Sequence, residues 1–289
     1  MPLKQIAALA ILFCPVLALG GDASGQFTAG KRPPIKPKYA AAYETHDQRD
    51  ARKTAVEVVL SEEPIDVVEA AVELDPHTNV INQKALRDHN YVLLWVRPDN
   101  DVSMNATYSE TMTQYIEMSG SRMTADMTAN TRDKVAGHLF SPKPLKTMDG
   151  DEYTIDLKFS TEVTRPPAGT KLPADGGEPG KALKALQAAI AKKSWEGIKT
   201  NVSAKKVESF DESYRTPKEN LDDAIQTLGF WLPKKAGKIT GGELRGDSAI
   251  VNLEGELFEN QNALFLVRMV KENSRWVFDR ATKAGMIDK

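Results

Sequence analysis

The chain has 289 residues, enough for about two domains, and its 41% hydrophobic and 27% charged content is ordinary for a globular protein. Its net charge of -2, spread over interspersed acidic and basic residues, argues against a nucleic-acid partner, because phosphate binding needs a basic surface.

The first twenty residues predict a targeting signal. Lys4 supplies a positive start, an apolar run follows over residues 6–19, and small residues precede an expected cleavage site between Gly20 and Ala23. This apolar run is short for a bilayer, so we expect no stable membrane span after cleavage.

Cleavage would also remove Cys14, the only cysteine of the chain. Disulfides, thiolate nucleophiles and zinc–cysteine sites are then excluded from the mature protein. An exported protein without disulfides must be held together by its core. This fits a bacterial periplasmic or secreted location better than a small extracellular eukaryotic domain, which usually relies on disulfides.

Two segments are expected between the signal and the middle of the chain. Residues 21–50 are polar and carry Pro33, Pro34 and Pro37, which predicts a flexible N-terminal tether. Residues 51–164 contain about seven short runs in which apolar and polar residues alternate, separated by turn signals. This pattern is typical of an all-β sandwich, immunoglobulin-like in shape only.

A proline- and glycine-rich stretch, residues 165–179, predicts a linker to a second domain. Apolar residues then recur at helical spacing over residues 182–190, and Thr216-Pro217-Lys218-Glu219 has the sequence of a helix-capping box. Residues 248–280 predict three strands on short turns, an antiparallel meander whose apolar face the preceding helices would cover.

Four patterns in this C-terminal part carry a resemblance to a known family. They are Ala182-Leu183-x-x-Leu186-x-x-Ala189-Ile190, Trp195, Gly246-Asp-x-Ala249-x-Val251 and Trp276-Val-Phe278-Asp279. They resemble the nuclear-transport-factor-2-like superfamily, which includes SnoaL-like and lumazine-binding-like proteins. The resemblance covers residues 180–289 and implies an α+β cone, with helices packed on an antiparallel sheet.

Members of this superfamily are enzymes, small-ligand binders or interaction modules. The resemblance implies that an enzymatic member needs Tyr/Asp or His/Asp groups inside the cone. No histidine follows His138, however, and Tyr214 is the only tyrosine after the linker. We therefore expect a protein that is not an enzyme and that has no catalytic residue.

Three residues are candidates for binding a ligand. Arg268 lies among apolar residues of an expected central strand, where it would hold an anionic ligand or, alternatively, pair with Glu254 or Glu256 across the sheet. Phe265 belongs to the same strand. Trp231 is part of an apolar cluster that would be a partner patch or a plug between a helix and the sheet.

Several other side chains are of types that can bind metal ions. A soft copper site is conceivable for the methionines of the middle segment, but their positions on alternating strands also suit core packing. They are Met104, Met112, Met118, Met123 and Met127. The four histidines have no ligand spacing, and the acidic turns lack a calcium-loop pattern, so we expect no metal and no cofactor.

The functional expectation is an exported, non-enzymatic binding or scaffold protein of the cell envelope, with an envelope protein or a small ligand as its partner. The alternative is a small-molecule carrier that uses the cavity of the C-terminal cone, with Arg268 contacting an anion. An enzyme of that fold is the third possibility.

Overall fold

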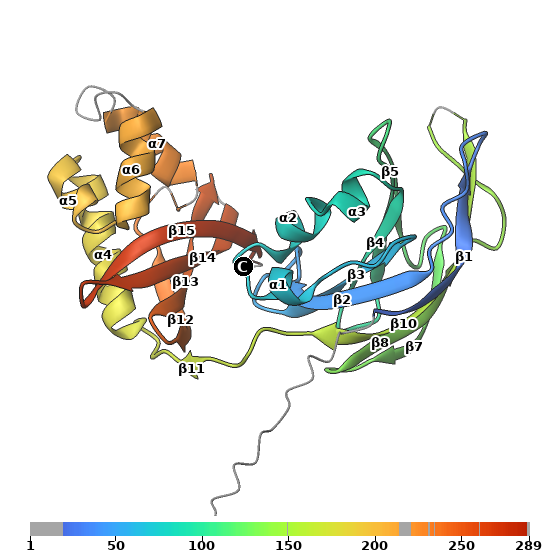
Figure 1. Ribbon diagram of the computed structural model, residues 1–289, viewed down its shortest axis with the longest axis horizontal. Coiled ribbons are helices and arrows are strands. Elements are labelled where there is room, and N and C mark those ends of the chain that lie inside the picture. Colours follow the sequence, from blue (N-terminus) through green and yellow to red (C-terminus); the bar gives the residue numbers. More distant parts are fainter. Residues whose placement is uncertain are drawn as a thin grey trace, which may run out of the picture.

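The computed structural model describes residues 20–148, 150–213, 221–230, 232–233, 235–259 and 261–287. In these residues the chain forms two separate sheets, one in each half of the sequence (Figure 1). The targeting signal, apart from its last residue, and the capping box at residues 216–219 lie outside the described residues, as do Tyr214 and Trp231.

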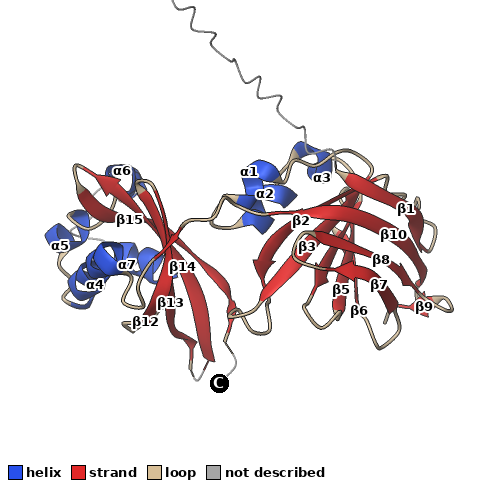
Figure 2. Cartoon of the chain, turned by 90° about the horizontal axis from the view of Figure 1, so that it is seen from below, coloured by secondary structure: helices blue, strands red, loops and turns tan. Residues whose placement is uncertain are grey.

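The N-terminal sheet has ten strands in the order β6-β5-β4-β3-β2-β1-β10-β8-β7, with β9 paired to β10. Their bounds are β1 Gly21–Ala29, β2 Tyr39–His46, β3 Thr54–Ser61, β4 Tyr91–Val96, β5 Val102–Tyr108, β6 Thr113–Met118, β7 Thr124–Asn130, β8 Lys134–Phe140, β9 Leu145–Lys146 and β10 Glu152–Thr164. The sheet is almost entirely antiparallel and curls into a half-barrel (Figure 2).

Apolar side chains from alternate strand positions fill the inside of this half-barrel. Alternate residues of most strands are apolar and buried on the inner face, where Phe27 packs among the rings of Tyr108, Tyr115 and Tyr153. On the outer face, β2, β3 and β4 are apolar as well, and three short helices cover them. These helices are α1 Val68–Ala71, α2 Pro76–Ile81 and α3 Lys84–Arg87.

The expected β-sandwich is therefore wrong. Alternation requires that each strand bury one face, but it does not say whether two sheets stack or one sheet closes on itself. Here eight successive pairings run through one sheet, and its own curvature brings the inner faces together. An immunoglobulin-like shape is excluded for the same reason.

The expected tether over residues 21–50 is also wrong. Strand β1 pairs with β10 over eight residues, and β2 pairs with β3 along its whole length, so both lie in the middle of the sheet. The sequence of β1 misled the prediction, because eight of its nine residues are small or polar and only Phe27 is large and apolar. The N-terminal domain thus begins before residue 51.

The C-terminal sheet has five antiparallel strands in the order β11-β12-β13-β14-β15. Their bounds are β11 Thr170–Lys171, β12 Lys238–Arg245, β13 Ser248–Phe258, β14 Gln261–Glu272 and β15 Arg275–Met286. One face packs against the helices α4 Gly177–Ala191, α5 Trp195–Lys199, α6 Ala204–Ser213 and α7 Leu221–Phe230. The other face is turned toward the N-terminal half (Figures 1 and 2).

The expected α+β cone is corrected as well. The protein is mostly β, and its helices are few and short: among the described helices only α4 is longer than ten residues. The sheet also extends beyond the expected meander, since β12 joins it and β13 to β15 are eleven or twelve residues long. Within the described residues, no helix combines the length and hydropathy that crossing a bilayer requires.

Phe265 allows a direct test of the C-terminal core. Its ring is fully buried between the sheet and the helices, so Phe265→Ala should lower the free energy of unfolding by about 3–5 kcal/mol. The exposed Ile116 of β6 is the control, and Ile116→Ala should change it by less than about 1 kcal/mol. Urea unfolding measures both, and equal effects would contradict the assigned core.

Candidate functional site

The two halves meet through the loop between β2 and β3, residues 47–53. Ala51 of this loop is completely buried beside Leu264 and Ile287 of the C-terminal half. Its backbone N–H donates to the carbonyl oxygen of Met286 at 2.8 Å. The loop is therefore part of the packing of both halves.

Close approach and charge strengthen this contact. Arg52 donates from Nε and Nη2 to the two carboxylate oxygens of Glu254, both at 3.1 Å. A side chain at Gly285 would place its Cβ 3.1 Å from the Cβ of Ala51 and 3.2 Å from the carbonyl oxygen of Asp47. Glycine at this position lets the last strand approach the loop.

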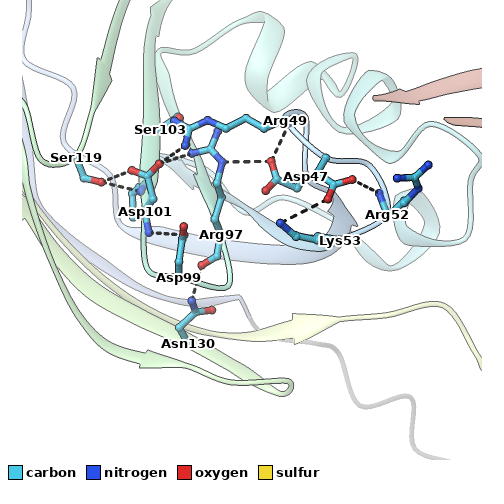
Figure 3. A network of polar contacts seen from close by, with 12 residues as sticks. Asp47, Arg49, Arg52, Lys53, Arg97, Asp99, Asp101, Ser103, Ser119 and Asn130 are labelled. Carbon is cyan, nitrogen blue, oxygen red and sulfur yellow. Dashed lines mark hydrogen bonds and ion pairs between the residues drawn. The ribbon is translucent and has the colours of Figure 1, made fainter. Parts of the chain in front are cut away.

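Figure 3 shows the polar network that holds the loop on the N-terminal side. Arg97 and Asp47 are only 7% and 6% exposed, and Arg97 Nε lies 3.2 Å from Asp47 Oδ1. Arg97 Nη1 donates to Asp101 Oδ2 and to Ser103 Oγ, while its carbonyl oxygen accepts from Asn130. A buried guanidinium with this many acceptors fixes the loop by geometry as well as by charge.

A groove of about 600 Å³ lies beside this junction. Its walls come from three segments that are distant in the sequence: Val72 and Leu74 after α1, residues 167–170 leading into β11, and the turn between β12 and β13. Ile250 and Arg268 contribute from the C-terminal sheet. Residues of both halves therefore form the walls of the groove.

Charged side chains cluster where Arg268 borders the groove. Arg268 donates from Nε and Nη2 to Asp279 Oδ2, both at 2.6 Å, and its Nη1 lies 3.8 Å from Glu73 Oε2. Arg280 is the direct cross-strand neighbour of Arg268 and also donates, from Nη2, to Glu73 Oε2. Glu73 belongs to the N-terminal half, so this cluster also joins the halves.

Two arginine N–H groups in this region are buried without an acceptor in the described residues. They are Nε of Arg280 and Nε of Arg245, which lines the groove and donates from Nη2 to Glu243 at 2.7 Å. Buried donors are almost always paired in folded proteins. The groove region therefore has hydrogen-bonding capacity that the described side chains do not use.

The three predicted ligand residues do not form one site. Arg268 does border the groove, but its partners are Asp279 and Glu73 rather than the glutamates of β13. Phe265 is fully buried on the opposite face of the same strand, against the helices. Trp231 lies outside the described residues, so its predicted role stays a prediction.

The methionines of the N-terminal sheet do not surround a common point. Met104 and Met123 are buried in the half-barrel, whereas Met112 is 71% exposed and Met118 is also exposed on the outside. Met127 packs at the margin of the core. Within the described residues, no group of three or more His, Cys, Asp or Glu side chains is placed to hold a metal ion.

Sequence reasoning missed two buried carboxylates. Glu57 is 1% exposed, beneath the helices that cover the outer face, and its Oε1 lies 2.7 Å from His77 Nδ1. Glu117 points into the half-barrel, where Arg122 and the hydroxyl of Tyr153 donate to it. The available signal was a charge inside an apolar run, as in Val-Glu-Val at residues 56–58.

A scan of the chain against models of protein families finds no match. A search of curated proteins finds no significantly similar sequence.

Asp47→Ala tests the network that fixes the loop. The substitution leaves the buried guanidinium of Arg97 with one carboxylate fewer, so we expect the free energy of unfolding to fall by about 3 kcal/mol. Asp156→Ala is the matched control, because this carboxylate is mostly exposed, and it should cost less than about 1 kcal/mol. Equal losses in urea unfolding would contradict the role of Asp47.

His77 should make stability depend on pH. The hydrogen bond to Glu57 raises the pKa of His77 above its ordinary value of 6.5, and this outweighs burial, which lowers it. A raised pKa stabilises the fold fully below pH 6.5, and the contribution disappears as the pH rises through the raised value. The destabilisation by His77→Gln should therefore be larger at pH 5 than at pH 9. Equal losses in unfolding experiments at both pH values would contradict this.

Proposed function

We propose that this chain is an exported, non-enzymatic binding protein that holds a small ligand in the groove between its two halves. The groove itself is the observation that carries the proposal: it combines apolar walls with arginine donors and draws on three separate segments. Concave sites of this size, mostly apolar with a few convergent polar groups, are the usual places where proteins bind small molecules.

The polar groups of the groove support binding rather than catalysis. The charged donors that line the groove are the guanidinium groups of Arg245 and Arg268, which donate hydrogen bonds and accept none. The carboxylates beside them, Glu243 and Asp279, are each paired with an arginine. Such groups can orient a ligand by hydrogen bonds, and they lack the adjacent acid and base that proton transfer needs.

The first twenty residues support export as part of this proposal. Their charged start, apolar run and small residues are typical of a signal for secretion to the periplasm or beyond. In that compartment a cysteine-free protein relies on its core, and both halves contain an extensive one. A bacterial envelope or extracellular location is thus part of the same proposal.

The proposal predicts that a ligand from a metabolite and lipid panel raises the melting temperature of the protein. Ala168→Trp should abolish the shift, because an indole at this exposed wall position would fill the groove. Ala236→Trp, at an exposed position before β12 that does not line the groove, is the matched control and should leave the shift intact.

Differential scanning fluorimetry measures both variants against the wild type. A shift that survives Ala168→Trp would place the ligand elsewhere. Two results together would contradict the small-ligand function: no compound of the panel shifts the melting temperature, and both tryptophan variants retrieve the same partner from envelope extract equally well. The protein would then act as a scaffold through a surface outside the groove.

A further inference from the structure

Arg268 and Arg280 form a pair of like charges on one face of the C-terminal sheet. They are directly opposite each other in the register of β14 and β15. Like charges in this position repel and destabilise the sheet unless an anion lies between them. Asp279 accepts hydrogen bonds from Nε and Nη2 of Arg268. The remaining nitrogen, Nη1, lies on the side of Glu73, which pairs with Arg280.

Glu73 supplies that anion from the other half of the protein. It lies between α1 and α2, and a single carboxylate oxygen, Oε2, accepts from Arg280 and lies 3.8 Å from Arg268. The contact to Arg268 is longer than a hydrogen bond. Asp279 thus neutralises Arg268, and Glu73 neutralises Arg280 through one oxygen and one guanidinium nitrogen.

The forked guanidinium group of Arg280 makes only part of the hydrogen bonds that it can donate. Its Nη2 donates to Glu73, while its Nε is buried without an acceptor in the described part of the chain. Carboxylates and phosphates bind arginine best through two parallel hydrogen bonds to such a fork. An external anion with two free oxygens could make the bidentate contact that Glu73 does not make here.

The groove specifies the rest of the ligand. Arg268 is one of its lining residues, and the walls near it are apolar at Val72, Leu74 and Ile250. An anionic head beside the two arginines would place its body along these side chains. Free inorganic anions would use only the arginines, whereas an anion with an apolar body would also remove apolar surface from water.

We propose that Arg268 and Arg280 form an anion-binding site that Glu73 occupies from within, and that a ligand with a carboxylate or phosphate head and an apolar body binds by displacing Glu73. This inference rests on the proposed function, because it needs a ligand in the groove.

Glu73→Gln tests the displacement. The variant keeps the size of the side chain and removes its charge, so decanoate and decyl phosphate should bind at least about 10-fold more tightly than to the wild type, since their internal competitor is gone. Glu69→Gln is the matched control: this exposed glutamate lies on α1, has the same charge and should leave the affinity unchanged.

The arginine side of the site is tested by Arg280→Lys in the Glu73→Gln background. Lysine keeps the charge and loses the fork, so the affinity for both probes should fall by about 10-fold. Circular dichroism and the melting temperature verify that each variant is folded. Isothermal titration calorimetry at low salt gives the dissociation constants.

Four ligands separate the possible sources of affinity. Decanoate and decyl phosphate tell a carboxylate from a phosphate head, inorganic phosphate tests the head alone, and decanol tests the apolar body alone. Binding of decanoate or decyl phosphate that Glu73→Gln strengthens and Arg280→Lys weakens supports the site.

Equal binding of either probe by the wild type and Glu73→Gln, or no binding by Glu73→Gln, would overturn it. If decanol bound every variant as tightly as decanoate and decyl phosphate do, and Ala168→Trp blocked all three, the anion site would be overturned as well. That last result would leave the proposed binding function standing, since the groove would still hold a ligand.

Discussion

The buried ion pair between Asp47 and Arg97 is the constraint on which the arrangement of the two sheets depends. Both side chains are removed from water, and a charge in that position is tolerated only if partners compensate it. Asp101 and Ser103 complete the compensation for Arg97. The loop that carries Asp47 is thus held in one conformation, and Ala51 in the same loop is placed where the C-terminal half packs on it.

The C-terminal sheet needs this contact because strand β14 is apolar on both faces. Phe265 and Val267 face the helices, whereas Leu264 and Leu266 face the N-terminal half. Without the docked loop the second pair would be exposed to water. Further along the same face the strand changes character at Arg268, and the cover becomes incomplete there. The groove lies where apolar packing gives way to charged side chains.

Local patterns in the sequence predict strands well and their assembly poorly. The three strands expected over residues 248–280 are present as β13, β14 and β15, with β14 between the other two. The alternation of residues 102–108 is also present in β5, whose apolar residues face the core. Whether such strands stack as two sheets or curl as one depends on contacts between distant residues, which periodicity does not contain.

Strand β6 shows how a single polar residue can reverse a pattern. Its apolar residues Ile116 and Met118 point outward, and Glu117 points into the half-barrel. The reversal is stable because Arg122 and Tyr153 meet the carboxylate there. Neither partner is identifiable from the strand itself, since Tyr153 is thirty-six positions away. The groove was hidden for the same reason, because its three wall segments converge only in the folded chain.

Docking of the halves and occupation of the proposed anion site are linked through Glu73. The carboxylate of Glu73, which accepts from Arg280 and lies near Arg268, ties the N-terminal half to the C-terminal sheet. A ligand that takes over the arginines removes this tie, whereas the contacts of Ala51 and Arg52 remain in place. Thermodynamic linkage then makes the effect reciprocal. A change that weakens the contact between Glu73 and the arginines strengthens ligand binding, and ligand binding weakens that contact by the same free energy. The proposed site thus gives a reason why two arginines lie opposite each other on one sheet while one of their two carboxylate partners comes from the other half.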